Sequence, residues 1–395
     1  MTALTDPRFT ALDITKFFAP TSGGIRTYLL AKAAYVATHP GLAQVVVVPG
    51  PVSEARRDGR TVWYRLRGPP IPTQHPYRLL LDRRSIRRIV DTERPDVIEV
   101  GSPYLVPWMM GRLAREYGIP LVWYFHTDFP RIIAPAGYGS GILRGSGAAL
   151  AWRYVRRLGR LFDCVVAASE FAVADLRRHG VDQAVKIPLG VDLDRFHPRR
   201  REAGRETRRA AGLPEAPVAM YVGRLAREKN LGLLFQAWPE VHRRTGAHLV
   251  LVGGGPSRAY YQARSPGPMI HWLPFEADRD RLADLHAAAD VYLAPGPAET
   301  FGLSALEALA SGTPVVSVEG AVAELVRGAG VGAAVPPDDP AALAEAVVRT
   351  FESGGAETRW SARAYAEAHH RWEDVFDRLF SLYRSLTPNE PPVPR

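Results

Sequence analysis

The run Val291-Tyr-Leu-Ala-Pro-Gly-Pro-Ala-Glu-Thr-Phe-Gly-Leu-Ser-Ala-Leu-Glu-Ala-Leu-Ala-Ser-Gly-Thr-Pro-Val-Val316 decides the fold class of this 395-residue chain. Its first four residues are apolar and rich in β-formers, which predicts a short buried strand. A Pro-Gly-Pro triplet ends that strand. Apolar residues then recur at helical spacing from Leu303 to Ala310, before Gly312 and Pro314 stop the helix and a second strand begins. Strand, turn, helix and strand in this order predict an α/β fold with parallel sheets, which bind ligands at the carboxyl ends of their strands.

Two carboxylates flank the turn of this unit. Glu299 lies in the loop, and Glu307 lies eight residues later in the helix, about 12 Å further along its axis. That separation is too large for a shared proton, but it suits the two ends of an extended polar ligand. Ordinary capping carboxylates on a surface helix are the alternative interpretation.

The start of this helix is the second feature of the run. We expect Thr300 or Ser304 to cap it. The backbone N–H groups of Phe301, Gly302 and Leu303 lack intrahelical acceptors and form a predicted phosphate site.

The whole run resembles the donor-site signature of glycosyltransferase family 4. Asp290 before it and Ser311-Gly-Thr-Pro-Val-Val316 at its end match as well. The resemblance implies a GT-B fold, in which two Rossmann-like parallel-sheet domains face each other across a cleft. It also implies retaining transfer of a hexose from a nucleotide-diphosphate sugar, linked to UDP or GDP, with no metal and no further cofactor. Glu307 is then expected to hold the donor ribose, and Glu299 the hydroxyls of the transferred sugar.

Composition limits the class of protein. With 46% hydrophobic residues, the chain can bury the cores of two domains. Its one cysteine, Cys164, lies in a strand-like run and is expected to be a buried thiol. The N-terminus has no signal-peptide pattern, and no uncharged apolar stretch approaches the roughly 18 residues of a membrane span. We therefore expect a cytoplasmic protein.

The net charge of +9 comes largely from clustered arginines. The clusters lie at residues 83–88, 153–160 and 199–209. Such charge suits anionic partners, or is only a solvated surface. No nucleic-acid-binding motif accompanies the arginines, so nucleic acid is not an expected partner. Peripheral contact with an anionic membrane through the basic N-terminal half is the alternative to a solvated surface.

The N-terminal half begins with a strand over residues 9–14 and a helix over residues 25–35. Gly23 and Gly24 precede the helix. Paired glycines let a ligand approach the backbone, and the positive end of the helix favours phosphate, although a tight turn alone would explain the pair. The family resemblance implies that both glycines face the donor phosphates. The dinucleotide fingerprint is incomplete here, which disfavours an oxidoreductase.

A strand over residues 121–125 delivers His126-Thr-Asp128 at its carboxyl end. A lone histidine is commonly structural, but resembled proteins place a histidine of this motif against the transferred sugar in the interdomain cleft. His126 is therefore a candidate sugar-positioning residue. Asp128 is either part of that site or the cap of the next segment.

Several further elements follow from periodicity and from breaker residues. Basic helices are expected at 78–90 and 143–162, the second with either a core-packed or a membrane-surface role. One long helix is expected at 361–386. The resemblance implies an acceptor-side domain over residues 1–188, a donor-binding domain over residues 189–360, and a terminal helix, 361–387, that crosses back to the first domain. Asp192 and Asp194 form a D-x-D sequence, but the surrounding residues resemble the family's interdomain connector rather than a metal site.

The C-terminal half supplies the cations. Arg224 and Lys229 lie in a loop between a strand at 218–222 and a helix at 231–244, and they match the family's diphosphate-binding pair. Negative charge grows on the leaving diphosphate as the glycosidic bond breaks, and cations can stabilise it. By resemblance, Gly223, Gly253 and Gly254 also line the donor.

The chain is thus expected to be a glycosyltransferase that most resembles mannosyltransferases and sulfoquinovosyl-diacylglycerol synthases. The expected partners are a nucleotide sugar and a glycan or glycolipid acceptor. A soluble acceptor, or a non-catalytic nucleotide-sugar-binding protein on the same scaffold, are the alternatives.

Overall fold

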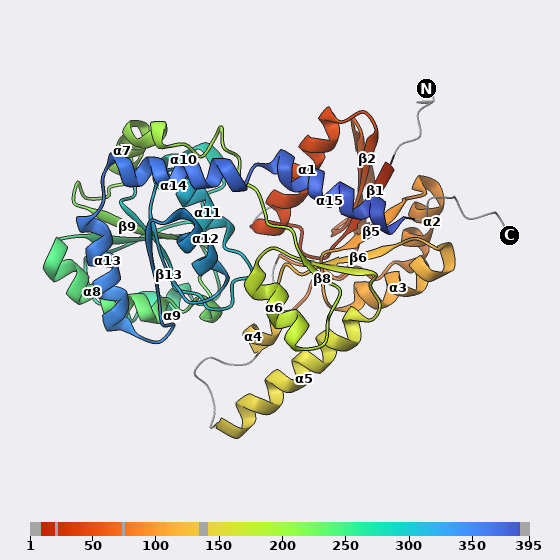
Figure 1. Ribbon diagram of the computed structural model, residues 1–395, viewed down its shortest axis with the longest axis horizontal. Coiled ribbons are helices and arrows are strands. Elements are labelled where there is room, and N and C mark those ends of the chain that lie inside the picture. Colours follow the sequence, from red (N-terminus) through yellow and green to blue (C-terminus); the bar gives the residue numbers. More distant parts are fainter. Residues whose placement is uncertain (1–8, 20–22, 73–75, 134–140, 388–395) are drawn as a thin grey trace. The chain divides into compact units, whose positions relative to one another are not determined.

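The computed structural model describes residues 9–19, 23–72, 76–133 and 141–387. The chain divides into two compact units (Figure 1). The first comprises Met1–Ala168, Ala172–Pro188 and Trp372–Arg395, and the second comprises Ser169–Phe171 and Leu189–Arg371. Each unit is built around its own sheet.

The sheet of the first unit has eight strands in the order β3-β4-β2-β1-β5-β6-β7-β8. All neighbouring strands are parallel except β3 and β4, which form an antiparallel hairpin. The strands are β1 (Phe9–Ile14), β2 (Leu42–Gly50), β3 (Glu54–Asp58), β4 (Thr61–Arg67), β5 (Val97–Val100), β6 (Leu121–Tyr124), β7 (Cys164–Ala167) and β8 (Ala184–Lys186).

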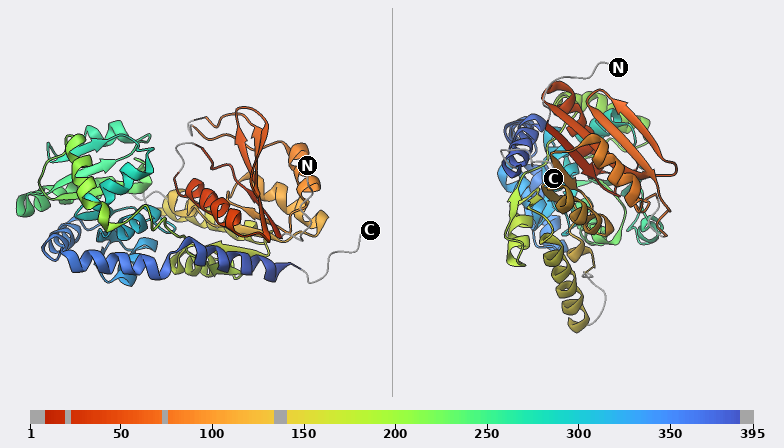
Figure 2. Two further views of the ribbon diagram at one scale, coloured as in Figure 1. Left: turned by 90° about the horizontal axis from the view of Figure 1, so that it is seen from above. Right: turned by 90° about the vertical axis from the view of Figure 1, so that its right-hand side faces the viewer.

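The helices connected to this sheet are α1 (Gly24–Thr38), α2 (Arg83–Glu93), α3 (Leu105–Tyr117), α4 (Phe129–Ile133), α5 (Gly141–Gly159), α6 (Glu170–Arg178) and α15 (Trp372–Leu386). The C-terminal helix α15 packs beside α1, where Phe376 and Phe380 contact Tyr35 (Figures 1 and 2). The C-terminal helix therefore belongs to the same compact unit as the N-terminal part of the chain.

The sheet of the second unit has six parallel strands in the order β11-β10-β9-β12-β13-β14. Its strands are β9 (Val218–Val222), β10 (His248–Val252), β11 (Ile270–Leu273), β12 (Val291–Ala294), β13 (Val315–Val318) and β14 (Gly332–Val335). Its helices are α7 (Arg201–Ala210), α8 (Leu231–Thr245), α9 (Arg258–Gln262), α10 (Arg279–Ala288), α11 (Leu303–Ala310), α12 (Ala321–Ala329), α13 (Pro340–Glu352) and α14 (Ala356–His369), with short 3-10 turns η1 (Pro198–Arg200) and η2 (Arg227–Lys229).

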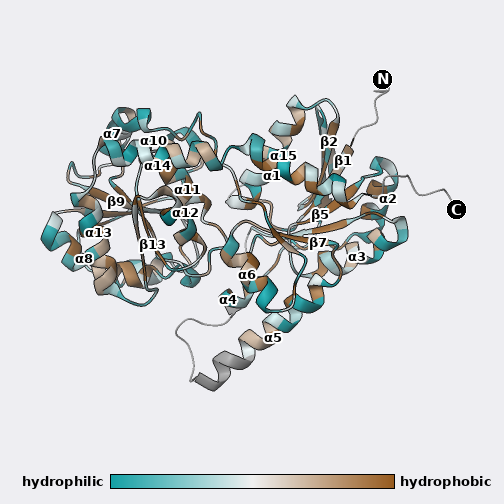
Figure 3. Cartoon of the chain, in the orientation of Figure 1, coloured by the Kyte–Doolittle hydropathy of each residue, from teal (hydrophilic) through white to brown (hydrophobic). Residues whose placement is uncertain are grey.

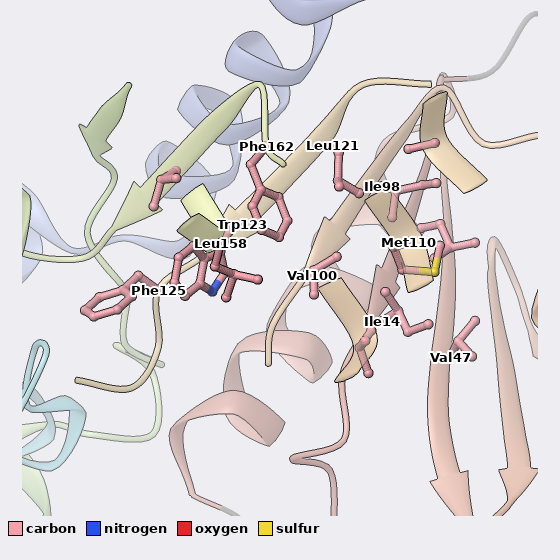
Figure 4. Packing of buried hydrophobic residues seen from close by; sticks show 14 of the residues in the cluster. Ile14, Val47, Ile98, Val100, Met110, Leu121, Trp123, Phe125, Leu158 and Phe162 are labelled. Atoms are coloured by element: carbon pink, nitrogen blue, oxygen red, sulfur yellow. The ribbon is translucent and has the colours of Figure 1, made fainter. Parts of the chain in front are cut away.

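The inner strands of each sheet are buried between helices, so they are nearly continuous apolar runs. Figure 3 shows this as brown strands inside helices whose outer faces are mostly teal. In the first unit, β-strand side chains such as Val100 and Trp123 pack against Met110 of α3 and Leu158 of α5 (Figure 4). The expectation of two parallel-sheet α/β domains is confirmed. Cys164 is buried as predicted, and burial raises the pKa of its thiol to about 11.

Two predictions about the first unit were wrong: the start of one helix, and the number of strands in the sheet. The basic helix begins at Arg83 rather than at residue 78, because Arg78 forms a bridge with Pro70 and the Asp82 side chain caps the helix by accepting from the Ser85 N–H. Strand β3 was missed because its five residues are all exposed and carry no apolar alternation. Such an edge strand leaves little periodic signal.

The expected single helix at 361–386 is two helices. Helix α14 ends at His369, and α15 begins at Trp372. Between them the backbone of Arg371 forms a parallel bridge with Val191, while the His370 ring bonds to the Leu189 carbonyl at 2.9 Å. These contacts interrupt the helical hydrogen bonds. The predicted core stripe on the last helix is confirmed for Phe376, Phe380 and Tyr383.

Candidate active site

Each sheet has a point at which the strand order reverses, and several of the predicted site residues lie in loops at these points. In the second unit, β9 lies between β10 and β12, so successive connections leave in opposite directions. The loop with Arg224 and Lys229 follows β9, and the loop with Glu299 follows β12. In the first unit, β1 and β5 flank the corresponding point. Parallel α/β sheets bind ligands at these positions.

The two loops of the second unit meet through a pair of opposite charges. The Lys229 Nζ donates to Glu299 Oε1 at 2.5 Å, although the residues are 70 positions apart in sequence. Both side chains retain solvent access, at 22% for Lys229 and 31% for Glu299. A half-exposed pair of this kind is worth little to stability, but it can exchange partners with a ligand at low cost. The structure thus brings together two of the residues predicted to be catalytic.

Arg224 lies in the same loop as Lys229 and is more open. Its side chain is 52% exposed, and its nearest carboxylate oxygen is that of Glu228, at 3.9 Å. The loop is held by its backbone: the Arg224 carbonyl accepts from the Tyr221 hydroxyl, and the Leu225 N–H donates to the Gly254 carbonyl. The backbone is therefore fixed while the guanidinium stays available.

Arg224 also borders a cavity of about 380 Å³. Its lining residues are Arg224, Ala226, Arg227, Glu228, Pro256, Ser257 and Tyr260. The cavity thus lies between the loop after β9 and the loop after β10.

The predicted glycines of the second unit allow these loops to approach each other. Gly253 has a φ of +143°, and a Cβ there would lie 2.0 Å from the Gly223 carbonyl oxygen. A Cβ on Gly223 would meet the Tyr221 hydroxyl at 2.7 Å. Gly254 has open space at that position. Gly253 is therefore required for the close approach of the two loops, and a side chain at Gly223 would displace the Tyr221 ring.

Helix α11 starts differently from the prediction. Its N-cap is Gly302, with a φ of +93° and no side-chain cap, so the expectation that Thr300 or Ser304 caps the helix was wrong. A left-handed residue suits glycine here, because a Cβ would collide with Val322 Cγ2 at 2.6 Å. Phe301 is buried against His370, and Leu303 is the first residue of the helix. No side chain therefore caps the N-terminus of this helix.

Glu307 lies inside α11 and is buried, away from the Lys229 pair. Its Oε1 accepts from Arg279 Nη2 of α10 at 2.6 Å. Its Oε2 lies 3.8 Å from His286 Nε2, and His286 is fully buried. Burial raises the pKa of the Glu307 carboxyl, against the opposing effect of Arg279. Burial, with the Arg279 charge as a second cause, lowers the pKa of His286 to about 3, so that the imidazole is neutral.

Arg279 and His286 were not found by sequence reasoning. Both belong to α10, and their only sequence signal is their spacing of seven residues, which places them on one helix face two turns apart. Neither residue matches a motif that points to a ligand. Their importance follows from their contacts with Glu307, which only the fold supplies.

His126 follows β6 in the first unit and lies in an aromatic setting. Its ring stacks on Tyr124 at a centroid distance of 4.1 Å and meets Tyr28 edge to face at 5.2 Å. Burial, and secondarily the charge of Lys32, lowers its pKa to about 3. A neutral imidazole held between two tyrosines is suited to hydrogen bonding with hydroxyls rather than to carrying charge.

Asp128 adopts the capping role that was one of its two predicted alternatives. Its Oδ1 accepts from the Arg131 N–H at the start of α4, and its Oδ2 pairs with the Arg131 guanidinium at 2.8 Å. Gly23 takes the N-cap position of α1, and Gly24 is the first helical residue. A Cβ on Gly23 would have no neighbour within 4 Å, so packing within the described chain does not demand glycine there.

A metal site would need a cluster of His, Cys, Asp or Glu side chains. Within residues 9–19, 23–72, 76–133 and 141–387, no group of three His, Cys, Asp or Glu residues has metal-binding geometry. Asp192, of the D-x-D sequence, accepts from the Arg195 N–H and pairs with its guanidinium at 3.0 Å. This aspartate therefore stabilises a turn.

Comparisons with known proteins match both halves of the chain to sequence families. Residues 22–195 match the family described as "Glycosyltransferase Family 4", and residues 216–353 match "Glycosyl transferases group 1". A GDP-mannose-dependent alpha-(1-6)-phosphatidylinositol dimannoside mannosyltransferase of Mycobacterium tuberculosis is 36% identical over 90% of this chain and 91% of its own length. The sulfoquinovosyl transferase SQD2 of Arabidopsis thaliana is 30% identical over 61% of this chain and 46% of its own.

Solved structures with the same fold cover nearly the whole chain. The sucrose-phosphate synthase from Thermosynechococcus elongatus superposes with a TM-score of 0.78, at 22% identity, over 96% of this chain and 99% of its own. Identity at this level shows the fold alone.

Proposed function

The chain belongs to glycosyltransferase family 4 and has its GT-B fold, and from that premise we propose that it transfers mannose, with retention, from GDP-mannose to a phosphatidylinositol-based glycolipid. The sugar, the donor base and the acceptor follow the mycobacterial relative named above, whose 36% identity extends over nine-tenths of both chains. That the chain is a glycosyltransferase follows from the family itself. The stereochemistry, the donor and the lipid acceptor are the proposal.

The observation that carries the proposal is the half-exposed Lys229–Glu299 pair at the strand-order reversal of the second sheet. When a sugar diphosphate binds, Lys229 transfers its hydrogen bond from Glu299 to a phosphate oxygen. Glu299, on the neighbouring loop, then accepts from a hydroxyl of the sugar. The Lys229–Glu299 pair therefore contacts both the diphosphate and the sugar, on the two sides of the glycosidic bond that breaks.

The negative charge of the leaving diphosphate explains why cationic side chains lie in this site. As the C1–O bond to the β-phosphate breaks, its electron pair passes to the diphosphate oxygen. Lys229, Arg224 and the uncapped N-terminus of α11 stabilise the new charge. Each charge-assisted hydrogen bond contributes about 1.5–3 kcal/mol, whereas the helix end contributes about 0.3–2 kcal/mol. The two side chains thus dominate this stabilisation.

The acceptor step completes the transfer. The acceptor hydroxyl attacks C1 from the face that the diphosphate leaves, which retains the configuration. Its proton passes to the leaving phosphate oxygen, so no separate side-chain base takes part. His126 is assigned to positioning the sugar by hydrogen bonding, and its lowered pKa keeps it neutral for that task. Gly23 and Gly24 are assigned to the donor phosphates by their resemblance to the glycine pair of family 4.

Glu307 is assigned to the donor ribose. Its second oxygen lies beside neutral His286, while the first is held by Arg279. The carboxylate is therefore fixed in one orientation before the ligand arrives. Such preorganisation improves binding because less freedom is lost on association.

The proposal is tested by incubating the purified chain with GDP-mannose and mannosylated phosphatidylinositol in excess EDTA. Formation of an α-linked product, shown by the anomeric coupling in its NMR spectrum, is the expected result. UDP-glucose and free inositol phosphate serve as the competing donor and acceptor. A β-linked product, dependence on divalent metal, or preference for a soluble acceptor would each overturn the corresponding part of the proposal. Binding of the donor without transfer or hydrolysis would indicate a non-catalytic protein.

A further inference from the structure

The outer surface of α3 and α5 in the first unit combines exposed apolar side chains with arginines. Leu105 is 54% exposed, Trp108 is 36% exposed and Leu150 is 57% exposed. Exposed arginines lie one or two helical turns from these residues, at Arg112 on α3 and at Arg153, Arg156 and Arg157 on α5. We call this surface the α3–α5 face. Exposed apolar side chains that gather on one surface, rimmed by polar residues, mark a candidate interaction site.

Contacts between the two helices make this one surface rather than two. The Trp108 indole Nε1 donates to the Tyr154 hydroxyl at 3.3 Å. The Arg157 guanidinium lies over the Trp108 ring, 5.3 Å from its centroid. Leu150 and Arg157 are seven residues apart on α5, so they share a side of that helix with Tyr154. Figure 1 shows α3 and α5 next to each other, with the N-terminal end of α5 reaching beyond the sheet.

The charge of the α3–α5 face is almost entirely positive. The sequence of α5 contains arginines and no acidic residue. Helix α3 carries one acidic side chain, Glu116, which pairs with Arg87 of α2. Arg83, Arg84 and Arg88 are exposed on α2, as is the acidic Asp91. An opposing partner must therefore be anionic over a wide area while accepting an indole and two leucine side chains.

We propose that the α3–α5 face docks onto the surface of a lipid bilayer that contains anionic lipids, a proposal that rests on the lipid acceptor of the proposed function. Basic side chains attract anionic headgroups, and Trp and Leu enter the boundary between headgroups and acyl chains. Arginine stems cover apolar surface while their charged ends reach the phosphates. No helix of the described residues is long and apolar enough to span a bilayer.

The α3–α5 face starts at the edge of the sheet where His126 lies. Helix α3 follows β5 through Gly101, where a Cβ would lie 3.6 Å from His126 Cδ2. Tyr104, which precedes α3, packs against Phe129 of α4 and lies under the Lys16 ammonium at 3.9 Å. A headgroup held at the N-terminal end of α3 would therefore be delivered to the edge that carries the candidate sugar-positioning histidine.

The test is sedimentation of the full chain with two kinds of vesicle over a range of salt concentrations. One kind contains phosphatidylcholine alone, and the other contains phosphatidylcholine with about 30% phosphatidylglycerol. Binding to the anionic vesicles only, weakened by salt, is expected. In a variant with Arg112→Glu and Arg153→Glu, the partition coefficient should fall at least about 25-fold, since each basic residue near a membrane contributes roughly fivefold. Leu105→Gln with Leu150→Gln should also lower it, with less salt dependence.

The matched control is Arg205→Glu with Arg209→Glu on α7 of the second unit, which changes the net charge by the same amount. Equal losses for the control and the face variant would overturn the proposal, as would equal binding to neutral and anionic vesicles. Competition by a short duplex DNA at the same charge ratio would instead indicate a nucleic-acid surface.

A transferase assay distinguishes failure of the docking proposal from failure of the proposed function. All variants are assayed on GDP-mannose with a detergent-dispersed acceptor, where the α3–α5 face variants should match the wild type. Loss of vesicle binding with intact transfer in detergent supports the docking face. Intact vesicle binding without any transfer would contradict the proposed function alone.

Discussion

A lysine lies among carboxylates in each unit, and the two settings differ. Lys32 of the first unit is fully buried and donates to Asp13 Oδ1 at 2.7 Å and to the Tyr383 hydroxyl at 2.9 Å, with Glu99 Oε2 at 3.6 Å. Lys229 of the second unit is partly exposed and has Glu299 at 2.5 Å. The first cluster ties α1 and α15 to strands β1 and β5, whereas the second joins two loops.

The difference distinguishes a charge cluster that is completed within the fold from a pair that can exchange partners with a ligand. In the Lys32 cluster the protein supplies further donors: Tyr28 donates to Glu99 at 2.8 Å, and Gln44 donates to Asp13 at 2.7 Å. Burial raises the pKa of Glu99 to about 7, while Lys32 and the tyrosines oppose that rise. A cluster completed in this way leaves no place for a ligand. The Lys229 pair is open to exchange, which is what a site for a charged ligand needs.

The largest expected effect comes from breaking the buried cluster. Lys32→Met leaves Asp13 and Glu99 as neighbouring buried carboxyls without a cation. Breaking a buried pair from one side costs about 3–5 kcal/mol, so the free energy of unfolding of the first unit should fall by about that amount. Urea denaturation measures it. Arg84→Met on the exposed side of α2 is the control, and a loss below 1 kcal/mol for Lys32→Met would show that the cluster is dispensable.

A smaller effect is expected at the donor ribose. Glu307→Ala removes one carboxylate whose proposed hydrogen bonds are each worth about 1.5–3 kcal/mol, so the KM for the donor should rise about 10- to 150-fold. Steady-state kinetics with GDP-mannose measures this change. His286→Phe, which leaves Glu307 and Arg279 in place, should change KM less than Glu307→Ala does. An unchanged donor KM in Glu307→Ala would remove this carboxylate from the site.

Acid should weaken the second unit through His286. The folded pKa of about 3 lies below that of an unfolded histidine, near 6.5, so the unfolded state binds the proton first. Stability is therefore lost as the pH falls from about 6.5 towards 3, at up to about 1.4 kcal/mol per pH unit. The raised pKa of Glu307 acts in the opposite sense.

Comparison with a variant isolates the histidine. His286→Phe should lose less stability than the wild type between pH 7 and pH 5, as measured by urea denaturation at each pH. Parallel pH profiles for the two proteins would show that this imidazole is not held neutral by the fold.

The smallest effect is expected for the exposed pair beside Lys229. The Arg224–Glu228 separation of 3.9 Å and the exposure of Arg224 make this pair worth about 0–1 kcal/mol. Glu228→Gln should therefore leave the free energy of unfolding unchanged within about 0.5 kcal/mol. A larger loss in thermal or urea denaturation would mean that the loop with Arg224 is held by its side chains rather than by its backbone.

Much of the fold was predictable because its strands are buried runs bounded by Gly and Pro. Strands β1, β9 and β12 have the predicted bounds. The break between α14 and α15 was not predictable, since residues 361–386 contain no Gly or Pro and only the distant Val191 backbone interrupts the helix. The start of α11 was mistaken because Thr300 fits the capping rule, while the backbone at Gly302 takes a left-handed conformation.

Contacts among the candidate site residues were predictable where a motif carried them, and not where only packing did. The Lys229–Glu299 contact joins two motif residues. Arg279 and His286 became visible only once α10 packed against α11 and brought both to Glu307. The roles of Gly23, Gly24 and His126 toward the donor and sugar stay predictions, since they belong to the first unit.

The most direct measurement compares GDP with GMP binding to the wild type and to Lys229→Met, by titration calorimetry in EDTA. If the open lysine holds the β-phosphate, the wild type should prefer GDP by at least about tenfold, the variant should lose most of that preference, and its melting temperature should stay close to that of the wild type. An undiminished preference for GDP in the variant would contradict the account, because the diphosphate would then be held elsewhere.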